Sequence, residues 1–277
     1  MKKCTFIVNS CDANEDTWVP FFICLEKNWP EMNWPVVLNT ESKSFKFGKY
    51  KIDSYGLFKN RRDKWSQRLK ETLQKIKTDY VFFILDDFFI VKPVKHEFIN
   101  QCFDWLDQNP QIAVFSFHPV ADENNEKSQQ FNGFEKRPLR GEYKLNCQAA
   151  IWRRERLIEF LKDDESPWEF EMYGSVRMSA FDDNFYVLSQ SQTPPIDYNM
   201  RKNGTGLVRG KWSKSVVVPL FKDLGLEIDF SKRGFIEEDY FDVDRRVFWQ
   251  KVRDYLRRRR KMLSARIWAW SYGQKSR

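Results

Sequence analysis

The first half of the chain alternates between short apolar runs and stretches whose apolar residues recur every three or four positions. The run "CTFIV" (4–8) predicts a buried strand, which leads through the polar turn "NSCDANED" into a helix that ends near residue 28. A second strand is expected in "WPVVLNT" (34–40). The chain therefore opens with a strand, a helix and a strand.

Residues 60–77 carry Trp65, Leu69, Leu73 and Ile76 at spacings of four, four and three, which predicts an amphipathic helix. The apolar run after it predicts a central strand, and a helix over about 95–108 and a strand over 112–117 are expected to follow. Strands and helices that alternate at this spacing predict an α/β fold. We expect a mixed, mainly parallel sheet flanked by helices.

The second half of the sequence is less regular. We expect a strand in 142–152, a helix in 153–164, and a further helix with Ser166 as its cap and Pro167 at its first position. Residues 199–213 are rich in glycine and basic side chains and are expected to form a loop.

Two aspartates interrupt the apolar stretch "DYVFFILDDFFIVKP". A carboxylate pair at such a place is costly to bury unless something pairs with it. Parallel α/β sheets bind ligands beyond the carboxyl ends of their strands, so Asp86 and Asp87 are expected to share one rim with the loop from Ser10 to Asp12. Mg²⁺ or Mn²⁺ takes such carboxylate oxygens and completes its shell with phosphates and water. A plainer alternative is that the pair caps the following turn or binds Lys92.

The composition indicates a folded protein with a large core. The chain has 277 residues, of which 42% are hydrophobic and 17% aromatic. Its five cysteines are scattered without a CxxC pair and are expected to be reduced thiols. The N-terminal apolar stretch is short for a signal peptide, and no run approaches the roughly 18–20 apolar residues that span a bilayer. We predict a cytoplasmic protein with one domain over 1–243 and a tail over 244–277.

The net charge of +8 belongs to the tail. Residues 245–277 contain twelve Lys/Arg and one acidic residue, a balance of +11 that leaves −3 for residues 1–244. An acidic body argues against a nucleic-acid partner. Apolar residues at 248, 252, 255/256, 262/263, 267 and 270 form one broad helical stripe among arginines. This pattern suits a helix at the anionic inner face of the cytoplasmic membrane, and a helix packed on the domain is the alternative.

Six segments across roughly residues 3–215 form a recognisable set. They are "FIVNS" with the following "CD", "RRDKWSQRL", "DYVFFILDDFF", "LNCQAAIWRRERLIEFL", "SPWEFE" and "NGTGLVRGKWS". Together these segments resemble GT-A glycosyltransferases, particularly sugar transferases from bacterial surface-polysaccharide (capsule or O-antigen) gene clusters. The resemblance implies a GT-A-like, Rossmann-like fold. It also implies transfer of a sugar from a nucleoside-diphosphate sugar, with UDP favoured, to a hydroxyl of a glycan or lipid-linked saccharide acceptor, with Mn²⁺ or Mg²⁺ at a DxD-type motif.

By this resemblance Asp87 ligates the metal, and Asp86 supports it or lies near the ribose. Ser10 and Asp12 belong to the loop that holds the nucleobase and ribose. This chain has Leu85 where the family often has an acid, and no histidine follows His118 to complete a metal shell. The basic candidates for the diphosphate are Arg61, Arg62, Lys64 and Arg68, together with Arg201, Lys202, Arg209 and Lys211.

An inverting transfer needs a carboxylate that removes the proton of the acceptor hydroxyl. The candidates are Glu171 and Glu169, beside Trp168, whose ring is suited to stack on a sugar face; Asp182 and Asp183 are reserves. The alternative for either glutamate is an acid favoured at a helix start by the macrodipole.

Two other functional classes fit parts of the pattern. A metal-dependent phosphodiesterase or nuclease would use the same aspartate pair and the basic tail. The acidic body and the lack of a further His/Asp cluster for a second metal count against that class. A non-catalytic scaffold that binds sugar nucleotides would explain the shortened acidic motif.

Overall fold

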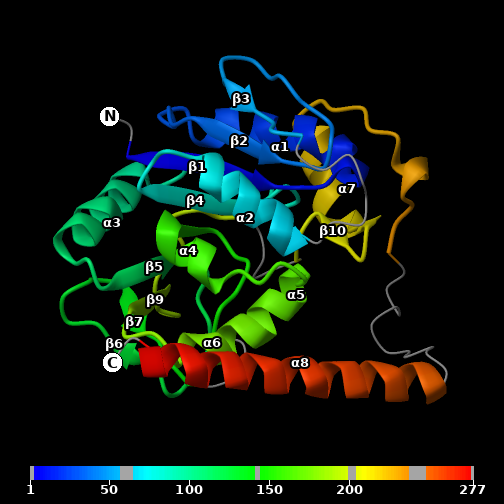
Figure 1. The fold of residues 1–277 in the computed structure, drawn as a ribbon. Coiled ribbons are helices and arrows are strands. Elements are labelled where there is room, and N and C mark those ends of the chain that lie inside the picture. The colour runs from blue at the N-terminus through cyan, green and yellow to red at the C-terminus, as the bar shows by residue number, and fades with distance from the viewer. Residues whose placement is uncertain (1–2, 57–64, 141–143, 199–203, 237–247, 276–277) are drawn as a thin grey trace.

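A nine-stranded sheet lies at the centre of the protein (Figure 1). The computed structural model describes residues 3–56, 65–140, 144–198, 204–236 and 248–275, without the side chains of 248–252 and 274–275. In chain order the strands of this sheet are β1 (Cys4–Asn9), β2 (Val36–Asn39), β3 (Ile52–Asp53), β4 (Tyr80–Leu85), β5 (Ile112–Ser116), β6 (Glu126–Lys127), β7 (Phe134–Lys136), β8 (Ala150–Arg153) and β9 (Asn184–Leu188).

Across the sheet the strands follow the order β3, β2, β1, β4, β8, β5, β9, β7 and β6. The first four are parallel to one another, and β8 runs antiparallel between β4 and β5. Strand β9 is again parallel to β5, whereas β7 runs against it. The mixed, mainly parallel sheet expected from the alternating pattern is confirmed.

Helices cover both faces of the sheet and form two apolar cores. Helices α1 (Glu15–Asn28), α3 (His96–Gln108) and α7 (Lys214–Asp223) contribute buried residues to the core on one face. Helices α2 (Trp65–Lys75) and α4 (Arg154–Phe160) contribute to the core on the other. Because both faces are covered, β1 and nearly all of β4 are buried, which explains their unbroken apolar sequences.

The prediction for residues 142–152 placed too much of the segment in a strand. Strand β8 begins only at Ala150, and the described residues before it form bends. The cause lies in Leu145 and Cys147, whose backbone N–H groups donate to Ser175 Oγ and to Glu171 Oε1. Side chains therefore replace a strand ladder here.

The helical stretch after Ser166 begins as predicted. Ser166 Oγ accepts from the N–H of Glu169, and the Glu169 carboxylate accepts from the N–H of Ser166 at 2.9 Å, a complete capping box. The stretch comprises α5 (Pro167–Glu169), the π-helical turn η2 (Phe170–Gly174) and α6 (Ser175–Met178).

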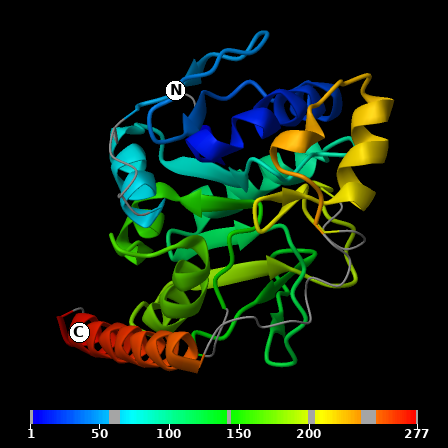
Figure 2. The same ribbon diagram turned by 90° about the vertical axis from the view of Figure 1, so that its right-hand side faces the viewer.

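The remaining described elements surround the sheet. The 3₁₀ turn η1 (Asp12–Asn14) follows β1, a hairpin joins β10 (Leu207–Val208) to β11 (Lys211–Trp212), and η3 (Phe230–Lys232) follows α7. Helix α8 (Phe248–Lys275) lies along α5 and α6, on the side of the molecule away from β2 and β3 (Figures 1 and 2). No helix in the described ranges combines the length and apolar character that crossing a bilayer requires.

Candidate active site

The ends of β1, β2 and β4 bring polar residues to one rim of the sheet. Asn9 lies opposite Leu85 in the parallel register, so the next residue of each strand leaves the sheet at the same level. The backbone N–H of Asp86 donates to Asn9 O at 3.1 Å, and that of Ser10 donates to Asn39 O at 3.1 Å. The structure confirms the expected rim, with Ser10 and the aspartate pair side by side.

Asp86 is buried within a shell of hydrogen-bond donors. Ser10 Oγ donates to its Oδ2 at 2.5 Å and Thr17 Oγ1 at 3.1 Å, while Asn14 Nδ2 donates to Oδ1 at 3.4 Å. Burial and the neighbouring charge of Asp87 nevertheless raise the pKa of Asp86. Lys92 does not offset this charge, because it pairs with Asp197. The alternative of an Asp–Lys92 pair is therefore wrong.

Asp87 is held from the opposite side by the segment before β10. Leu207 N donates to Asp87 Oδ2 at 3.3 Å, and Gly206 N donates to the backbone O of Asp87 at 2.9 Å. Burial raises the pKa of Asp87, against the opposing effect of hydrogen bonds from Thr205 and Leu207. The pair thus resists full ionisation, and a cation that approached it would favour the charged form.

A cavity of about 840 Å³ opens beside the aspartate pair. This volume is in the range of sites for small ligands and cofactors, roughly 300–1,000 Å³. The walls come from the rim, from α2, from α5 with η2, and from the β10–β11 hairpin. Its lining residues are Asn9, Ser10, Cys11, Asn14, Glu41, Trp65, Arg68, Leu85, Asp86, Asp87, Phe88, Cys147, Gln148, Pro167, Trp168, Glu171, Thr205, Leu207, Val208, Arg209 and Gly210.

Of the basic residues expected on the helix over 60–77, the structure places Arg68 in the wall of the cavity. Its side chain is buried; Nη2 donates to Ser10 O at 2.7 Å, and Nη1 pairs with Glu41. Arg68 therefore ties α2 to the rim and presents a positive charge there. Three other candidates, Arg61, Arg62 and Lys64, lie outside the described residues, as do Arg201 and Lys202.

Asp12 is not among the residues that line the cavity. Its carboxylate accepts hydrogen bonds from the backbone N–H groups of residues 41–43 and from Ser42 Oγ. Burial acts to raise the pKa of Asp12, but these bonds outweigh it and lower the pKa. Asp12 fixes the loop that carries Glu41, so its contribution to a ligand would be indirect.

The two glutamates proposed as bases face different surroundings. Glu171 lines the cavity, where its Oε1 accepts from the N–H of Cys147 at 2.7 Å. Burial raises the pKa of Glu171. Glu169 instead pairs with Lys261 and Arg257 of α8 at 3.1 and 3.2 Å. Its contacts make Glu169 part of a helix junction, whereas the Glu171 carboxylate is placed where a ligand in the cavity could reach it.

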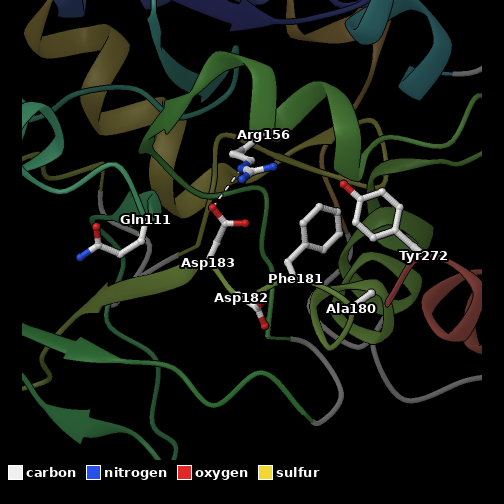
Figure 3. A pocket seen from close by; sticks show the side chains of 7 residues that line it. All are labelled: Gln111, Arg156, Ala180, Phe181, Asp182, Asp183 and Tyr272. Carbon is white, nitrogen blue, oxygen red and sulfur yellow. Dashed lines mark hydrogen bonds and ion pairs between the residues drawn. The ribbon is translucent and has the colours of Figure 1, made fainter. Parts of the chain in front are cut away.

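The reserve acids lie in another place. Asp182 and Asp183 line a separate, smaller pocket of about 240 Å³ together with Tyr272 of α8 (Figure 3). Asp183 pairs with Arg156 at 2.9 Å (Figure 3). The structure therefore does not bring these two aspartates to the carboxylate pair after β4.

The β10–β11 hairpin brings one of its two basic candidates, Arg209, to the cavity. Arg209 and Gly210, at the turn, belong to the lining, whereas Lys211 is absent from it. Arg209 has φ of 51°, the left-handed conformation that non-glycine residues rarely adopt. The hairpin thus places Arg209 at the cavity and leaves Lys211 without a described contact to a ligand site.

Arg233 is a residue of this site that sequence reasoning missed. Its Nε donates to Asp16 Oδ2 at 2.7 Å, Nη1 to Gly210 O at 3.1 Å, and Nη2 to Asn14 Oδ1 at 3.1 Å. Its guanidinium also lies 5.6 Å from the ring centroid of Trp212. Arg233 therefore joins the loop after β1 to the hairpin. No motif in the surrounding sequence marks it, because all these partners are distant in the chain.

The aspartate pair fits a divalent cation that takes part of its shell from a ligand. Among the described residues no group of three or more His, Cys, Asp or Glu side chains is arranged to hold a metal. In the part of the chain that the structure describes, neither the buried Asp86 nor the partly buried Asp87 has a hydrogen bond or ion pair to a lysine or arginine, and the two carboxylates form a hard oxygen donor set. Such a set suits Mg²⁺ or Mn²⁺ when phosphate oxygens and water supply the remaining ligands.

No family model matches the chain, and no curated protein matches it. Among solved structures it is similar to S. aureus TarS 1-349, with 15% identity over 68% of this chain and 58% of that one and a TM-score of 0.45. It is also similar to a Pyrobaculum calidifontis mannosyltransferase solved with GDP-Man and Mn²⁺, with 14% identity over 68% of this chain and 55% of that one and a TM-score of 0.42. A third similar structure is the bifunctional IspDF of Campylobacter jejuni, with 12% identity over 69% of this chain and 50% of that one and a TM-score of 0.37. The match to TarS thus spans under two thirds of that chain, and these distant likenesses assign no substrate.

Proposed function

We propose that this protein is a GT-A-type glycosyltransferase that moves a sugar from a nucleoside-diphosphate sugar to a hydroxyl group. One observation carries the proposal: a single cavity holds the carboxylate pair at the end of a central strand and a third carboxylate, Glu171, beside an exposed Trp168. The pair serves a diphosphate with its cation, and Glu171 serves proton removal. The two chemical requirements of glycosyl transfer thus meet in one place.

The donor end of the proposed site is the rim after β1 and β4. Asp87, supported by Asp86, would hold Mn²⁺ or Mg²⁺, and this cation would offset the charge that develops on the departing diphosphate. Ser10 orients Asp86, and Arg68 adds a fixed positive charge to the same wall. We favour UDP as the nucleotide, on the family resemblance of the sequence.

The acceptor end is the wall formed by α5 and η2. Glu171 has a raised pKa, which makes its carboxylate a stronger base toward an acceptor hydroxyl near neutral pH. Trp168 is 71% exposed although it lines the cavity, so its ring has a free face for stacking on a sugar. We propose a glycan or lipid-linked saccharide of surface-polysaccharide synthesis as the acceptor, reached at the inner face of the cytoplasmic membrane.

The test begins with binding and then separates chemistry from binding. UDP, GDP, UDP-GlcNAc and GDP-Man are screened by thermal shift with Mn²⁺ or with EDTA, and donor hydrolysis and transfer are read by mass spectrometry. We expect one nucleotide to raise Tm, and we expect EDTA to reduce turnover. Undiminished turnover in EDTA would contradict the metal role of Asp87.

Matched glutamate variants test the base. Glu171→Gln keeps the acceptor for Cys147 N–H and should lower kcat about 100-fold or more with nucleotide affinity unchanged. Glu169→Gln is the control and should leave kcat near the wild-type value. Loss of activity in Glu169→Gln alone would assign the base to Glu169.

Two outcomes would replace the proposal with another class. Binding of the donor without hydrolysis or transfer to any acceptor in a saccharide array would indicate a scaffold. Cleavage of phosphodiesters, with no nucleotide-sugar binding, would indicate a metal-dependent phosphodiesterase.

A further inference from the structure

Helix α8 is docked on the domain by one of its faces. Ala265 and Ala269 are buried, and the rings of Trp268 and Tyr272 lie 6.0 and 4.7 Å from that of Phe181. These contacts recur every three or four residues, so they lie on one side of the helix. The helix is therefore packed on the domain, which agrees with the alternative stated for the tail in the sequence analysis.

The opposite face of α8 carries an apolar stripe that no described residue covers. Leu256, Leu263, Ile267 and Trp270 follow one another at spacings of seven, four and three, which align them on one face. Their exposed fractions are 59%, 59%, 56% and 70%. We call these four residues the outer stripe. At 100° per residue the outer stripe lies about 180° from Ala265. The helix therefore has two apolar faces, one buried against the domain and one exposed.

Arginines border the outer stripe on both sides. Arg253, Arg259, Arg260 and Arg266 are exposed and lie within about 80° of it in helical projection. They have no acidic residue of the domain as a described partner; Arg253 approaches Asp254 of the same helix at 4.0 Å. An exposed apolar stripe bordered by arginines, with a tryptophan near one end, has the chemistry of an interfacial helix.

We propose that the outer stripe and its four arginines bind an anionic membrane surface, with the stripe inserted among the acyl chains and the guanidinium groups at the lipid phosphates. Charge selects this occupant. A second copy of the same face would bring arginines against arginines, and a nucleic acid would leave the apolar stripe in contact with phosphates. Anionic headgroups above an apolar layer match both parts of the face.

The same helix is linked to the cavity through one short segment. Glu169 pairs with Lys261 and Arg257, while its neighbours Trp168 and Glu171 line the cavity. A membrane bound along α8 would therefore lie close to the proposed acceptor wall. This deepens the proposed function by assigning the membrane contact to named residues of α8, and it rests on that function only for the role of the cavity.

Vesicle binding tests the proposal without turnover. The full chain is sedimented with vesicles of phosphatidylcholine alone and with vesicles containing 30% phosphatidylglycerol in about 0.1 M salt. We expect partition into the anionic vesicles only. Leu263→Ser with Ile267→Ser and Trp270→Ser should lower partition at least tenfold, and Arg259→Gln with Arg260→Gln and Arg266→Gln should lower it by a similar factor.

Val218→Ser is the matched control, because Val218 is an exposed apolar residue of α7, away from α8. All variants should keep the wild-type Tm and nucleotide binding, since the outer stripe is exposed and contributes to neither of the two apolar cores. Wild-type partition in both triple variants would overturn the proposal. A change of oligomeric state in sedimentation velocity without a change in vesicle binding would overturn it in favour of self-association. Failure of donor binding with intact vesicle binding would overturn the proposed function alone.

Discussion

Arg233 contacts the loop after β1 from a position 217 residues beyond Asp16. Its three guanidinium nitrogens donate to Asp16, Asn14 and Gly210, and Asn14 in turn donates to Asp86. We infer that Arg233 is a positioning residue, because two of these partners, Asn14 and Gly210, line the cavity. A fork of donors is needed for this geometry, and lysine cannot reproduce it.

We expect Arg233→Gln to weaken nucleotide binding about tenfold and to raise the donor KM, because Asn14 and the hairpin lose their common anchor. Arg233→Lys keeps the charge but not the fork and should recover little of the affinity. Calorimetry with the nucleotide and steady-state kinetics measure both effects. Equal losses of kcat with KM unchanged in both variants would argue against a positioning role.

The β10–β11 hairpin contributes to the site as an element. It reaches Asp87 through a close backbone approach at Gly206, whose N–H binds Asp87 O at 2.9 Å. A Cβ atom at this position would lie 2.3 Å from Cε2 of Phe89 and 3.1 Å from Asp87 O. The small residue is thus required by the contact between the hairpin and the strand end.

Gly206→Ala should destabilise the protein by about 2 kcal/mol, because the buried ring of Phe89 has to shift. It should also weaken nucleotide binding by displacing Leu207 N from Asp87. Gly273→Ala is the control: the position lies on α8, an added Cβ would meet no atom within 4 Å beyond the adjoining helix backbone, and the change should stabilise the protein slightly. Thermal unfolding with and without nucleotide distinguishes the two effects.

At the scale of the whole molecule, the site lowers the stability of the fold that carries it. Two adjacent carboxylates with raised pKa values bind protons in the folded state that they release on unfolding at the same pH. The folded state then binds more protons than the unfolded state between the ordinary and the raised pKa. Stability therefore falls as pH rises through this window.

Asp87→Asn should consequently raise Tm in the presence of EDTA by about 3 °C at pH 8, and the gain should disappear near pH 4, where Asp87 is protonated in the folded protein. The same variant should lose transfer activity. Calorimetry at both pH values checks the prediction. An equal gain at both would show that ionisation of Asp87 is not the cause.

The elements of the first half could be read from the sequence because their signals are local. Strands β1 and β4 are buried on both faces of the sheet and therefore have unbroken apolar sequences. Helices α2 and α3 are buried on one face, so their apolar residues recur every three or four positions. The cap at Ser166 is equally local. The shared rim could be predicted because the carboxyl ends of parallel strands meet at the same edge of a sheet, which places Ser10 near Asp86.

The tertiary structure decided which of the candidate side chains meet. Glu169 and Glu171 are two positions apart on a helical turn, so they point in different directions, one to α8 and one to the cavity. Arg233 acquires its role only when the chain returns to the loop after β1. The tail carries two apolar faces, and the periodic pattern alone did not separate the one that docks from the one left exposed.

The sequence by itself determined the sheet, its rim and the carboxylate pair, because these depend on local burial and strand direction. Long-range packing selected the partners of each charge, because a side chain's role depends on the atoms that the fold brings against it.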